Sequence, residues 1–352
     1  MISSLFMYEG KSIVVAVNPG STSTKVKVYN RVDGKKLYGG DFNEKDFQSL
    51  LVSLREGEDV SFAIRIVHAG SLSETTLLTD EIEKKIKEFI HFAPIHNTLA
   101  LERIRLIKSL FPESKIYVVF DFGFHSTIPE EHYTYLIHKE IIERFGLRKY
   151  GFHGIALRSL IKKIKKRCEE KEMTFPSHLV AAHLGGGCSI TAIKDGKSFA
   201  TTMELTPLSG LPMITRSGSV DPSIYPILVR KGLSVDEIDD LLEKKSGFYG
   251  FLGTKDTKEI FQRASDGEQQ SSLAFRIFVS EVVRHIIGYG GLMGSLDAVA
   301  FSGGIGFGNE YFRSVVVERL SVFLNREFEV FVIDVDEERV MFEDVVFLEE
   351  GK

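Results

Sequence analysis

The chain has 352 residues, which is enough for about two domains. Its composition, 43% hydrophobic and 26% charged, is that of an ordinary globular protein and excludes a disordered tail, a collagen and a multi-spanning membrane protein. The formal net charge of −5 disfavours nucleic acid as a partner.

Neither a targeting signal nor a disulfide framework is predicted. Cys168 and Cys188 form no CxxC pair, and reduced thiols in a cytoplasmic protein are the simplest interpretation. Met1 to Lys11 lacks the basic start and apolar run of a signal peptide. No run of about 18 apolar residues occurs, so we expect no contact with a membrane.

The first half of the chain opens with a predicted three-stranded meander. The strands are expected at Ser12–Asn18, Lys25–Asn30 and Lys35–Phe42, with a Gly/Ser/Thr-rich turn after the first and an Asp33-Gly34 hairpin before the third. Helical periodicity follows at Asp80–Phe92 and Leu99–Leu110, and Lys115–Asp121 is a further predicted strand.

The second half repeats this pattern. Strands are expected at His178–His183, Ser189–Lys194 and Lys197–Met203, with the Leu184–Gly187 turn after the first and an Asp195-Gly196 hairpin before the third. Helices are predicted at Ser234–Glu243 and Ser272–Gly288, and a buried strand, Asp297–Ser302, leads into the glycine-rich Gly303–Gly308. The irregular stretch 205–222 is long enough to suggest function.

The duplicated meander with facing glycine turns predicts an α/β chain with the duplicated actin-like (ribonuclease H-like βββαβα) fold, a two-domain plan with a central cleft. In that plan, backbone N–H groups of the turns hold nucleotide phosphates. Neither a GxxxxGK[ST] nor a GxGxxG motif occurs. We expect domains at 1–148 plus 337–352 and at 149–336.

Taken singly, the candidate site residues have ordinary structural explanations. Arg65, inside an apolar run, would pair with a carboxylate, and Asp121 would cap a turn. His153 would be a satisfied core histidine, and the acidic cluster at 334–338 would be a solvated turn or helix start. Four glycines in six positions at 303–308 are harder to explain without a close backbone approach.

Together, these segments resemble the acetate and butyrate kinase family of the actin-like superfamily. The resemblance runs through VVAVNPGSTSTK (14–25), RIVHAG (65–70), FAPIHN (92–97), VFDFGFHSTIP (119–129), RKYGFHG (148–154), AHLGGGCS (182–189), ATTMELTPLSGLPMITRSGSVDP (200–222), KSGFYGFLGTKD (245–256), DAVAFSGGIGFGN (297–309) and VIDVDEERV (332–340). The segment TPLSGLPMITRSG is specific to the family and resembles the sequences of acetate kinases more than those of butyrate kinases.

The resemblance implies reversible transfer of the γ-phosphoryl group of ATP to acetate or propionate, with Mg²⁺, in a homodimer. A carboxylate is already a nucleophile at pH 7, so the site must supply positive charge and donors rather than a base. The implied catalytic residues are Arg65, Asp121, His153 and Arg216, and the implied metal-site residues are Asn18 and Glu337. Arg65, Val67, Ile95, Phe152 and Pro207 would bind the carboxylate and its acyl group. Ser21, Ser23, Lys25, His183, Gly185, Gly186, Gly187, Asp256, Lys258, Gly303, Gly304, Ile305 and Gly306 would bind ATP.

The chain departs from the acetate kinase pattern at several positions. Gly186 stands where the family has an Asn, and Lys258 where it has an Arg. Phe307 and Gly308 differ from the family's residues after GIG. After YGFHG, Ile155 and Leu157 replace a Thr and a His of the family. Lys cannot reproduce a bidentate Arg contact, so these departures bear on nucleotide binding.

Three alternatives stay open at this point. The turns GSTST and HLGGG resemble butyrate kinases, which suggests a butyrate or branched-chain fatty acid kinase. An actin-like hydrolase of acyl phosphates would use the same cleft with water as acceptor. A non-catalytic nucleotide-binding protein would keep the cleft without the chemistry.

Overall fold

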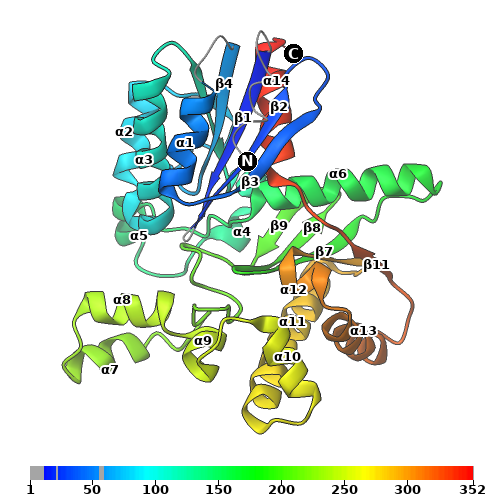
Figure 1. Ribbon diagram of the computed structural model, residues 1–352. Helices are drawn as coiled ribbons and strands as arrows, with labels where there is room; N and C mark the ends of the chain where they lie inside the picture. The colour runs from blue at the N-terminus through cyan, green and yellow to red at the C-terminus, as the bar shows by residue number, and fades with distance from the viewer. Residues whose placement is uncertain (1–11, 21–22, 55–58, 352) are drawn as a thin grey trace. The chain divides into compact units, whose positions relative to one another are not determined.

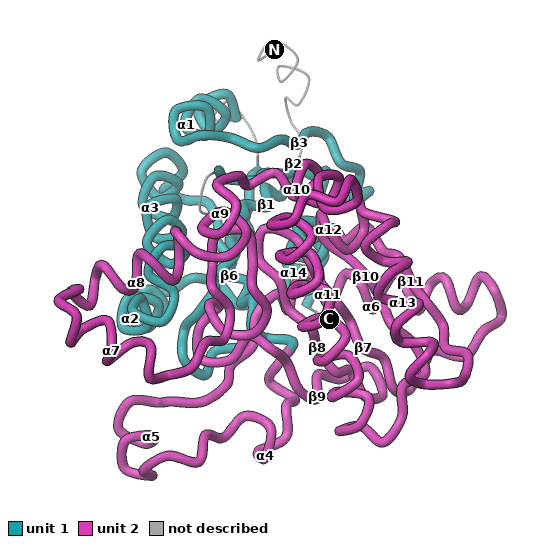
Figure 2. Tube along the Cα trace, turned by 90° about the horizontal axis from the view of Figure 1, so that it is seen from below, with its two compact units in different colours: residues 1–124, 336–352 teal, residues 125–335 magenta. Residues whose placement is uncertain are grey.

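The structure, a computed structural model, describes residues 12–20, 23–54 and 59–351. Its contacts group the chain into two compact units, one of residues 1–124 with 336–352 and one of residues 125–335 (Figure 2). The last helix of the chain therefore belongs to the first unit. The domain boundaries expected from the sequence, 1–148 with 337–352 and 149–336, stay a prediction.

The first unit is built on a six-stranded sheet in the order β3-β2-β1-β4-β6-β5. β1 pairs antiparallel with β2 and parallel with β4, and β4 pairs parallel with β6. The strands are β1 (Ser12–Pro19), β2 (Thr24–Asn30), β3 (Lys36–Phe42), β4 (Asp59–Ile66), β5 (Thr76–Leu77) and β6 (Lys115–Phe120).

Helices cover both faces of this sheet. Figure 1 shows α1, α2 and α3 on one side and α14 on the other. In accord with this, the central strand β1 is apolar on both faces and its side chains Ile13 to Val17 are fully buried. The helices are α1 (Glu44–Ser53), α2 (Asp80–Glu88), the 3₁₀ turn η2 (Ile90–Phe92), α3 (Pro94–Leu110) and α14 (Glu337–Glu349); a second 3₁₀ turn, η3 (Gly123–Thr127), follows β6.

The second unit repeats the sheet plan. Its five strands lie in the order β11-β10-β7-β8-β9, with β7 antiparallel to β8 and parallel to β10. The strands are β7 (His178–Leu184), β8 (Cys188–Lys194), β9 (Lys197–Thr201), β10 (Ala298–Ser302) and β11 (Glu329–Val332). Three antiparallel strands followed by two parallel ones occur in both sheets, so the predicted α/β fold with a duplicated βββαβα unit is confirmed.

The helices of the second unit pack around a cluster of aromatic side chains. Phe261 contacts Phe248, Phe275 and Phe312, with ring centroids 5.1 to 5.9 Å apart, and so joins α9, α10, α11 and α13. The helices are α4 (Glu130–Tyr133), α5 (Lys139–Phe145), α6 (Gly154–Glu170), α7 (Ile224–Arg230), α8 (Val235–Lys244), α9 (Gly247–Leu252), α10 (Thr257–Ser265), α11 (Gln269–Met293), α12 (Gly303–Gly308) and α13 (Glu310–Leu324).

Several expected boundaries shift in the structure. The helix expected over Asp80–Phe92 ends at Glu88, and residues 90–92 form a 3₁₀ turn. The strand expected over Lys197–Met203 ends at Thr201, and the glycine-rich residues 303–308, to which the sequence assigned no element, form the short helix α12. In the part of the chain that the structure describes, every helix is too short or too polar to cross a membrane.

Candidate active site

In the first unit, four elements bring charged side chains to the end of the sheet at which β1 and β4 finish. Arg65 on β4 donates to Asp121 Oδ2 at 2.7 Å and to Asn18 Oδ1 at 3.1 Å. Asp121 directly follows β6, and Asn18 lies near the end of β1. The pairing of Arg65 with a carboxylate is thus observed, and the carboxylate is the one that the sequence singled out.

The N-terminus of α14 completes this network. Asn18 Nδ2 donates to Glu337 Oε2 at 3.1 Å and to Glu338 Oε1 at 2.9 Å. The helix starts after Asp336, whose side chain accepts the backbone N–H of Arg339. A helix N-terminus stabilises negative charge, which suits two carboxylates in its first turn.

Glu338 is the site residue that sequence reasoning missed. Its side chain is fully buried and its Oε2 lies 3.3 Å from Lys25 Nζ and 3.1 Å from Lys27 Nζ. The acidic cluster is a helix start, as one of the two structural interpretations had it, but Glu338 within it is buried and not solvated. The alternation in KVKV puts Lys25 and Lys27 on one face of β2, which was the available signal for a buried acidic partner.

The charges of this network shift one another's pKa values. Burial opposes the charge of Arg65, but Asp121 and Glu337 raise its pKa, so the guanidinium stays protonated. Burial raises the pKa of Glu337, which Arg65 lowers and the Asp121 and Glu338 carboxylates raise further. Burial alone would lower the pKa of Lys27, but Asp336 and Glu338 raise it above its ordinary value.

The remaining predicted residues of the first unit lie just after β4, on α3 and just before β2. Val67, just after β4, is buried, and Ile95 lies half-buried in the first turn of α3. Ser23 is half-buried, and its carbonyl accepts the N–H of Gly20 at 2.8 Å and so closes the turn after β1. Ser21 lies outside the described residues.

In the second unit, two predicted histidines lie side by side. The rings of His153 and His183 are 4.7 Å apart between centroids. His153 Nδ1 is 3.0 Å from Ser189 Oγ, and His183 Nδ1 is 3.0 Å from Ser302 Oγ, so strands β8 and β10 orient the two rings. His153 also has a φ of 62°, which few residues other than glycine adopt.

The two glycine-rich segments of the second unit, the turn 185–187 and the start of α12, lie against each other. A Cβ on Gly303, whose φ is +77°, would lie 2.5 Å from the Leu184 carbonyl oxygen, and one on Gly185 would lie 3.4 Å from the Gly304 nitrogen. A Cβ on Gly187 would lie 3.0 Å from His153 Nε2. Gly186 and Gly304 have open space around them, so only some of these glycines are required by close packing.

Arg216 is held by its own loop and by Glu243 of α8. Its Nε lies 3.2 Å from Glu243 Oε2, and its Nη1 donates to the buried Pro207 carbonyl at 3.5 Å. The loop 205–222 is irregular, as predicted. Arg216 also lowers the pKa of the Cys188 thiol, although burial raises that pKa more, to about 12.

The other predicted residues of this unit have structural contacts of their own. Phe152 is fully buried, and its carbonyl lies 2.8 Å from His125 Nε2. Asp256 caps α10 by accepting the N–H of Lys258, and both side chains are exposed. Ile305 and Gly306 are buried in α12. Val67 and Ile95 lie in one unit and Phe152 and Pro207 in the other, so the four-residue acyl pocket stays a prediction.

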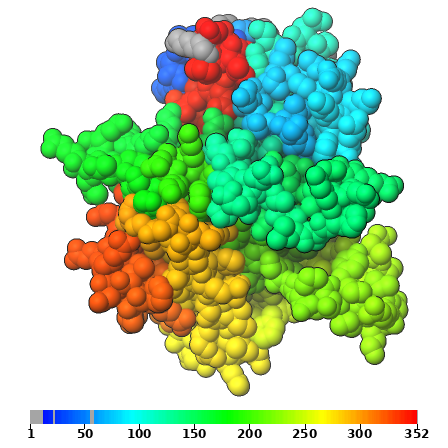
Figure 3. Space-filling model, turned by 180° about the vertical axis from the view of Figure 1, so that it is seen from behind, coloured from blue at the N-terminus to red at the C-terminus, as the bar shows by residue number. Residues whose placement is uncertain are grey.

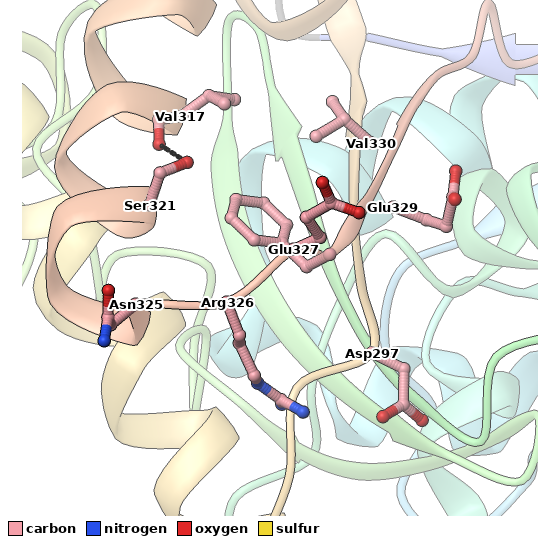
Figure 4. Close-up of a pocket in the computed structure, with 9 residues that line it drawn as sticks. Asp297, Val317, Ser321, Asn325, Arg326, Glu327, Glu329 and Val330 are labelled. Carbon is pink, nitrogen blue, oxygen red and sulfur yellow. Dashed lines mark hydrogen bonds between the residues drawn. The ribbon is translucent and has the colours of Figure 1, made fainter.

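A cavity of about 620 Å³ lies elsewhere in the second unit, at the starts of β10 and β11 (Figure 4). The two glycine-rich segments follow the other ends of β7 and β10. Two of the charged groups at the cavity already have partners, because Asp297 pairs with His178 at 3.0 Å and Arg326 donates to the Leu296 carbonyl at 2.7 Å. None of the predicted site residues lines this cavity.

The chain was compared with known proteins. A sequence model described as the acetokinase family matches residues 54–344. An acetate kinase of Halothermothrix orenii is 39% identical over 259 residues, which cover 73% of this chain and 65% of that protein. An acetate kinase of Francisella tularensis subsp. holarctica is 38% identical over 317 residues, covering 87% and 80%. The chain thus spans just under two thirds of the first of these relatives.

Solved structures are similar over almost the whole chain. A propionate kinase from Francisella tularensis subsp. tularensis superposes with a TM-score of 0.86 at 30% identity, covering 95% of this chain and 98% of that one. Porphyromonas gingivalis acetate kinase superposes with a TM-score of 0.82 at 27% identity, covering 96% and 100%.

Proposed function

The chain belongs to the acetokinase family, and from this premise we propose that it catalyses reversible phosphoryl transfer from ATP to acetate or propionate, giving ADP and an acyl phosphate. The observation that carries the proposal is the network in which Arg65 bridges Asp121 and Asn18, and Asn18 bridges Glu337 and Glu338. Such a network keeps a cation and metal-binding oxygens in fixed positions, which phosphoryl transfer requires.

The chemistry needs no general base, because the acceptor carboxylate is the nucleophile. One carboxylate oxygen attacks the γ-phosphorus in line, the bond to the β-phosphate oxygen of ADP breaks, and that oxygen leaves with the negative charge. Two anions must therefore be brought together, and the guanidinium fork of Arg65 suits a carboxylate or a phosphoryl group. Arg216 and His153 would supply further donors to the transferring group.

Mg²⁺ fits the donor set of the first unit. Asn18, Asp121 and Glu337 offer only oxygen ligands, which this ion prefers. Among the described residues, no three acidic, His or Cys side chains form a metal cage. Mg²⁺ usually binds through one or two carboxylates together with substrate phosphates, so a complete cage is not needed. When bound, the ion would neutralise charge on the phosphates, while Asn18 and Glu337 hold it.

The second unit would hold the nucleotide. The close contact between the Gly185–Gly187 turn and Gly303 leaves backbone without side chains at one end of the sheet, as binding of phosphates to backbone N–H groups requires. His183 is oriented there by Ser302. ATP as the phosphoryl donor and this set of contacts are part of the same proposal.

Homodimerisation and a cytoplasmic location complete the proposal. α7 has no buried residue although it carries Ile224, Ile227 and Val229, and an apolar helix of this kind suits an interface between subunits. The thiols of Cys168 and Cys188 are free and buried, as suits a reducing compartment.

The deciding experiment is a hydroxamate-trapping assay of acyl phosphate with ATP, Mg²⁺ and carboxylates of two to four carbons. We expect acetate and propionate to be the better substrates, with butyrate lower by about tenfold in kcat/KM. A rise in kcat/KM from acetate to butyrate would favour a butyrate kinase. ADP release without a carboxylate would favour a hydrolase, and no turnover at all would leave nucleotide binding only.

A further inference from the structure

An amide side chain holds the backbone where the chain leaves β4. The side chain of Asn97, in the first turn of α3, donates from Nδ2 to the His68 carbonyl at 2.7 Å, and its Oδ1 accepts the His68 N–H at 3.3 Å. Both residues are fully buried. The amide therefore satisfies the two backbone groups that a neighbouring strand would otherwise bind.

The His68 ring fixes the same segment from its other side. Its Nδ1 accepts the N–H of Gly70 at 3.2 Å. The ring stacks with Phe89, Phe92 and Phe122, whose centroids are 5.4, 4.9 and 5.7 Å away. Burial, with a small contribution from His91, lowers the pKa of His68 to about 3, so the ring is neutral at pH 7. A neutral ring in an aromatic layer contributes packing and an acceptor, not charge.

These contacts fix the position of Val67, which lies between two anchored neighbours. On one side, the Ile66 carbonyl accepts the N–H of Asp121 at 2.8 Å. On the other side, His68 is bound by Asn97, which lies two residues after Ile95 on α3. One amide side chain thus links Val67 and Ile95, the two residues of this unit that are proposed to contact the acyl group.

We infer that Asn97 is a positioning residue that fixes the separation of Val67 and Ile95 and thereby sets the selectivity for acyl chain length. The inference rests on the proposed function. A pocket rejects a longer acid only if its walls do not yield, because the cost of an extra methylene is the cost of displacing packed side chains. The two hydrogen bonds of Asn97 make one wall rigid.

The test is the chain-length profile of Asn97→Ala. The ratio of kcat/KM for acetate to that for butyrate should fall by about three- to tenfold, mainly through a lower KM for butyrate, with the KM for ATP unchanged. Ile107→Val is the matched control, because Ile107 is a fully buried residue of the same helix that contributes nothing to the Asn97 contacts. The control should keep the parental ratio.

A second variant covers the case in which Asn97→Ala does not fold. Asn97→Asp fills the same volume and keeps the acceptor for the His68 N–H but, when ionised, lacks the donor for the His68 carbonyl. It should lower the ratio as well. In a Val67→Ala background, the effect of either substitution should shrink, because the wall that Asn97 holds is then absent.

The outcomes separate the two claims. A selective parent whose folded Asn97 variants stay within twofold of its ratio would overturn the inference and leave the proposed function intact. A control that changes the ratio as much as Asn97→Ala would also overturn it, because the effect would then be general loss of packing. A parent that forms no acyl phosphate from any acid would remove both claims.

Discussion

Arg216 offers the cleanest test of a single proposed catalytic side chain, because its ion-pair partner can be removed separately. We expect Arg216→Ala to lower kcat by about 10³-fold, the order of magnitude for a cation on a transferring phosphoryl group. Its pair with Glu243 is partly exposed, so the melting temperature should change little. Glu243→Ala breaks the same pair and should keep nearly parental kcat. Similar kinetics for the two variants would reduce Arg216 to a structural role.

Arg65 is a less clean target, because its partner Asp121 is fully buried. Removing one member of a buried pair leaves an uncompensated charge and costs about 3–5 kcal/mol. A loss of activity in Arg65→Ala would therefore mix catalysis with stability, and only measurements on the folded fraction would be informative.

We expect the substitution Glu337→Gln to increase stability and to weaken activity at low Mg²⁺. The pKa of Glu337 is raised in the folded protein, so the folded state binds the Glu337 proton more tightly than the unfolded state does. This proton binding stabilises the fold at pH values below the pKa of the unfolded state, and the stabilisation is lost as the pH rises through the pKa of the folded state. Without Mg²⁺, Glu337→Gln should raise the melting temperature at pH 8 by about 1–3 °C, with no gain near pH 4. The same variant should require more Mg²⁺ for half-maximal activity. A lower melting temperature at pH 8 would contradict this account.

The sequence identified Arg65, Asp121 and Asn18 as site candidates but not their connections. Arg65 lies beside Asp121 because β4 pairs parallel with β6. The periodicity of the sequence does not reveal which strands pair. Glu338 was indistinguishable from its acidic neighbours, because only the pitch of α14 decides which carboxylate faces the two lysines of β2. Asn97 was one polar residue at the start of a helix, and its partner is a backbone 29 residues away.

At the scale of elements, the contact between the turn after β7 and the start of α12 can be tested with a pair of alanine substitutions. Gly303→Ala should destabilise the protein by about 1–3 kcal/mol, because φ is +77° and the new Cβ would lie 2.5 Å from the Leu184 carbonyl oxygen. A Cβ at Gly304 would have no neighbouring atom within 4 Å, so Gly304→Ala should keep the parental free energy of unfolding. Chemical denaturation measures both. Equal stability of the two variants would mean that the two segments separate more easily than their packing indicates.

Element prediction succeeded where periodicity is strong and failed at the ends. The strand expected over Ser12–Asn18 is one residue longer, and the helix expected from Leu99 begins earlier, at Pro94, since proline is favoured in a first turn. The helix expected over Asp80–Phe92 ends early because its last residues turn into the aromatic layer around His68. Tertiary packing, which local pattern cannot contain, decided that boundary.

At the scale of the whole molecule, α14 covers one face of the first sheet. It contacts β1, β2, β4 and β6, and its residues Val340, Met341, Phe342 and Val345 are buried. Figure 3 shows the red C-terminal residues between the blue and cyan ones of the first unit. Burial of four such side chains is worth about 6–12 kcal/mol, comparable to the stability of a domain.

Deleting residues 336–352 should therefore unfold the first unit. Hydrogen exchange would show loss of protection in β1 and β4, while the aromatic cluster around Phe261 in the second unit keeps its protection. A synthetic peptide of residues 336–352 should restore part of the protection in β1. Retention of full protection in β1 after the deletion would contradict the role given to α14.

The position of α14 in the chain also has a consequence for synthesis. The strands of the first sheet leave the ribosome early, but the helix that covers them follows residues 125–335. At about 5–20 residues per second, this interval lasts roughly 10–40 s, during which the nascent chain carries an uncovered apolar surface. A chaperone that binds exposed sheet has its opportunity in that interval. The carboxylates of Glu337 and Glu338 arrive with the same helix, so their hydrogen bonds to Asn18 form only after residues 125–335 have been synthesised.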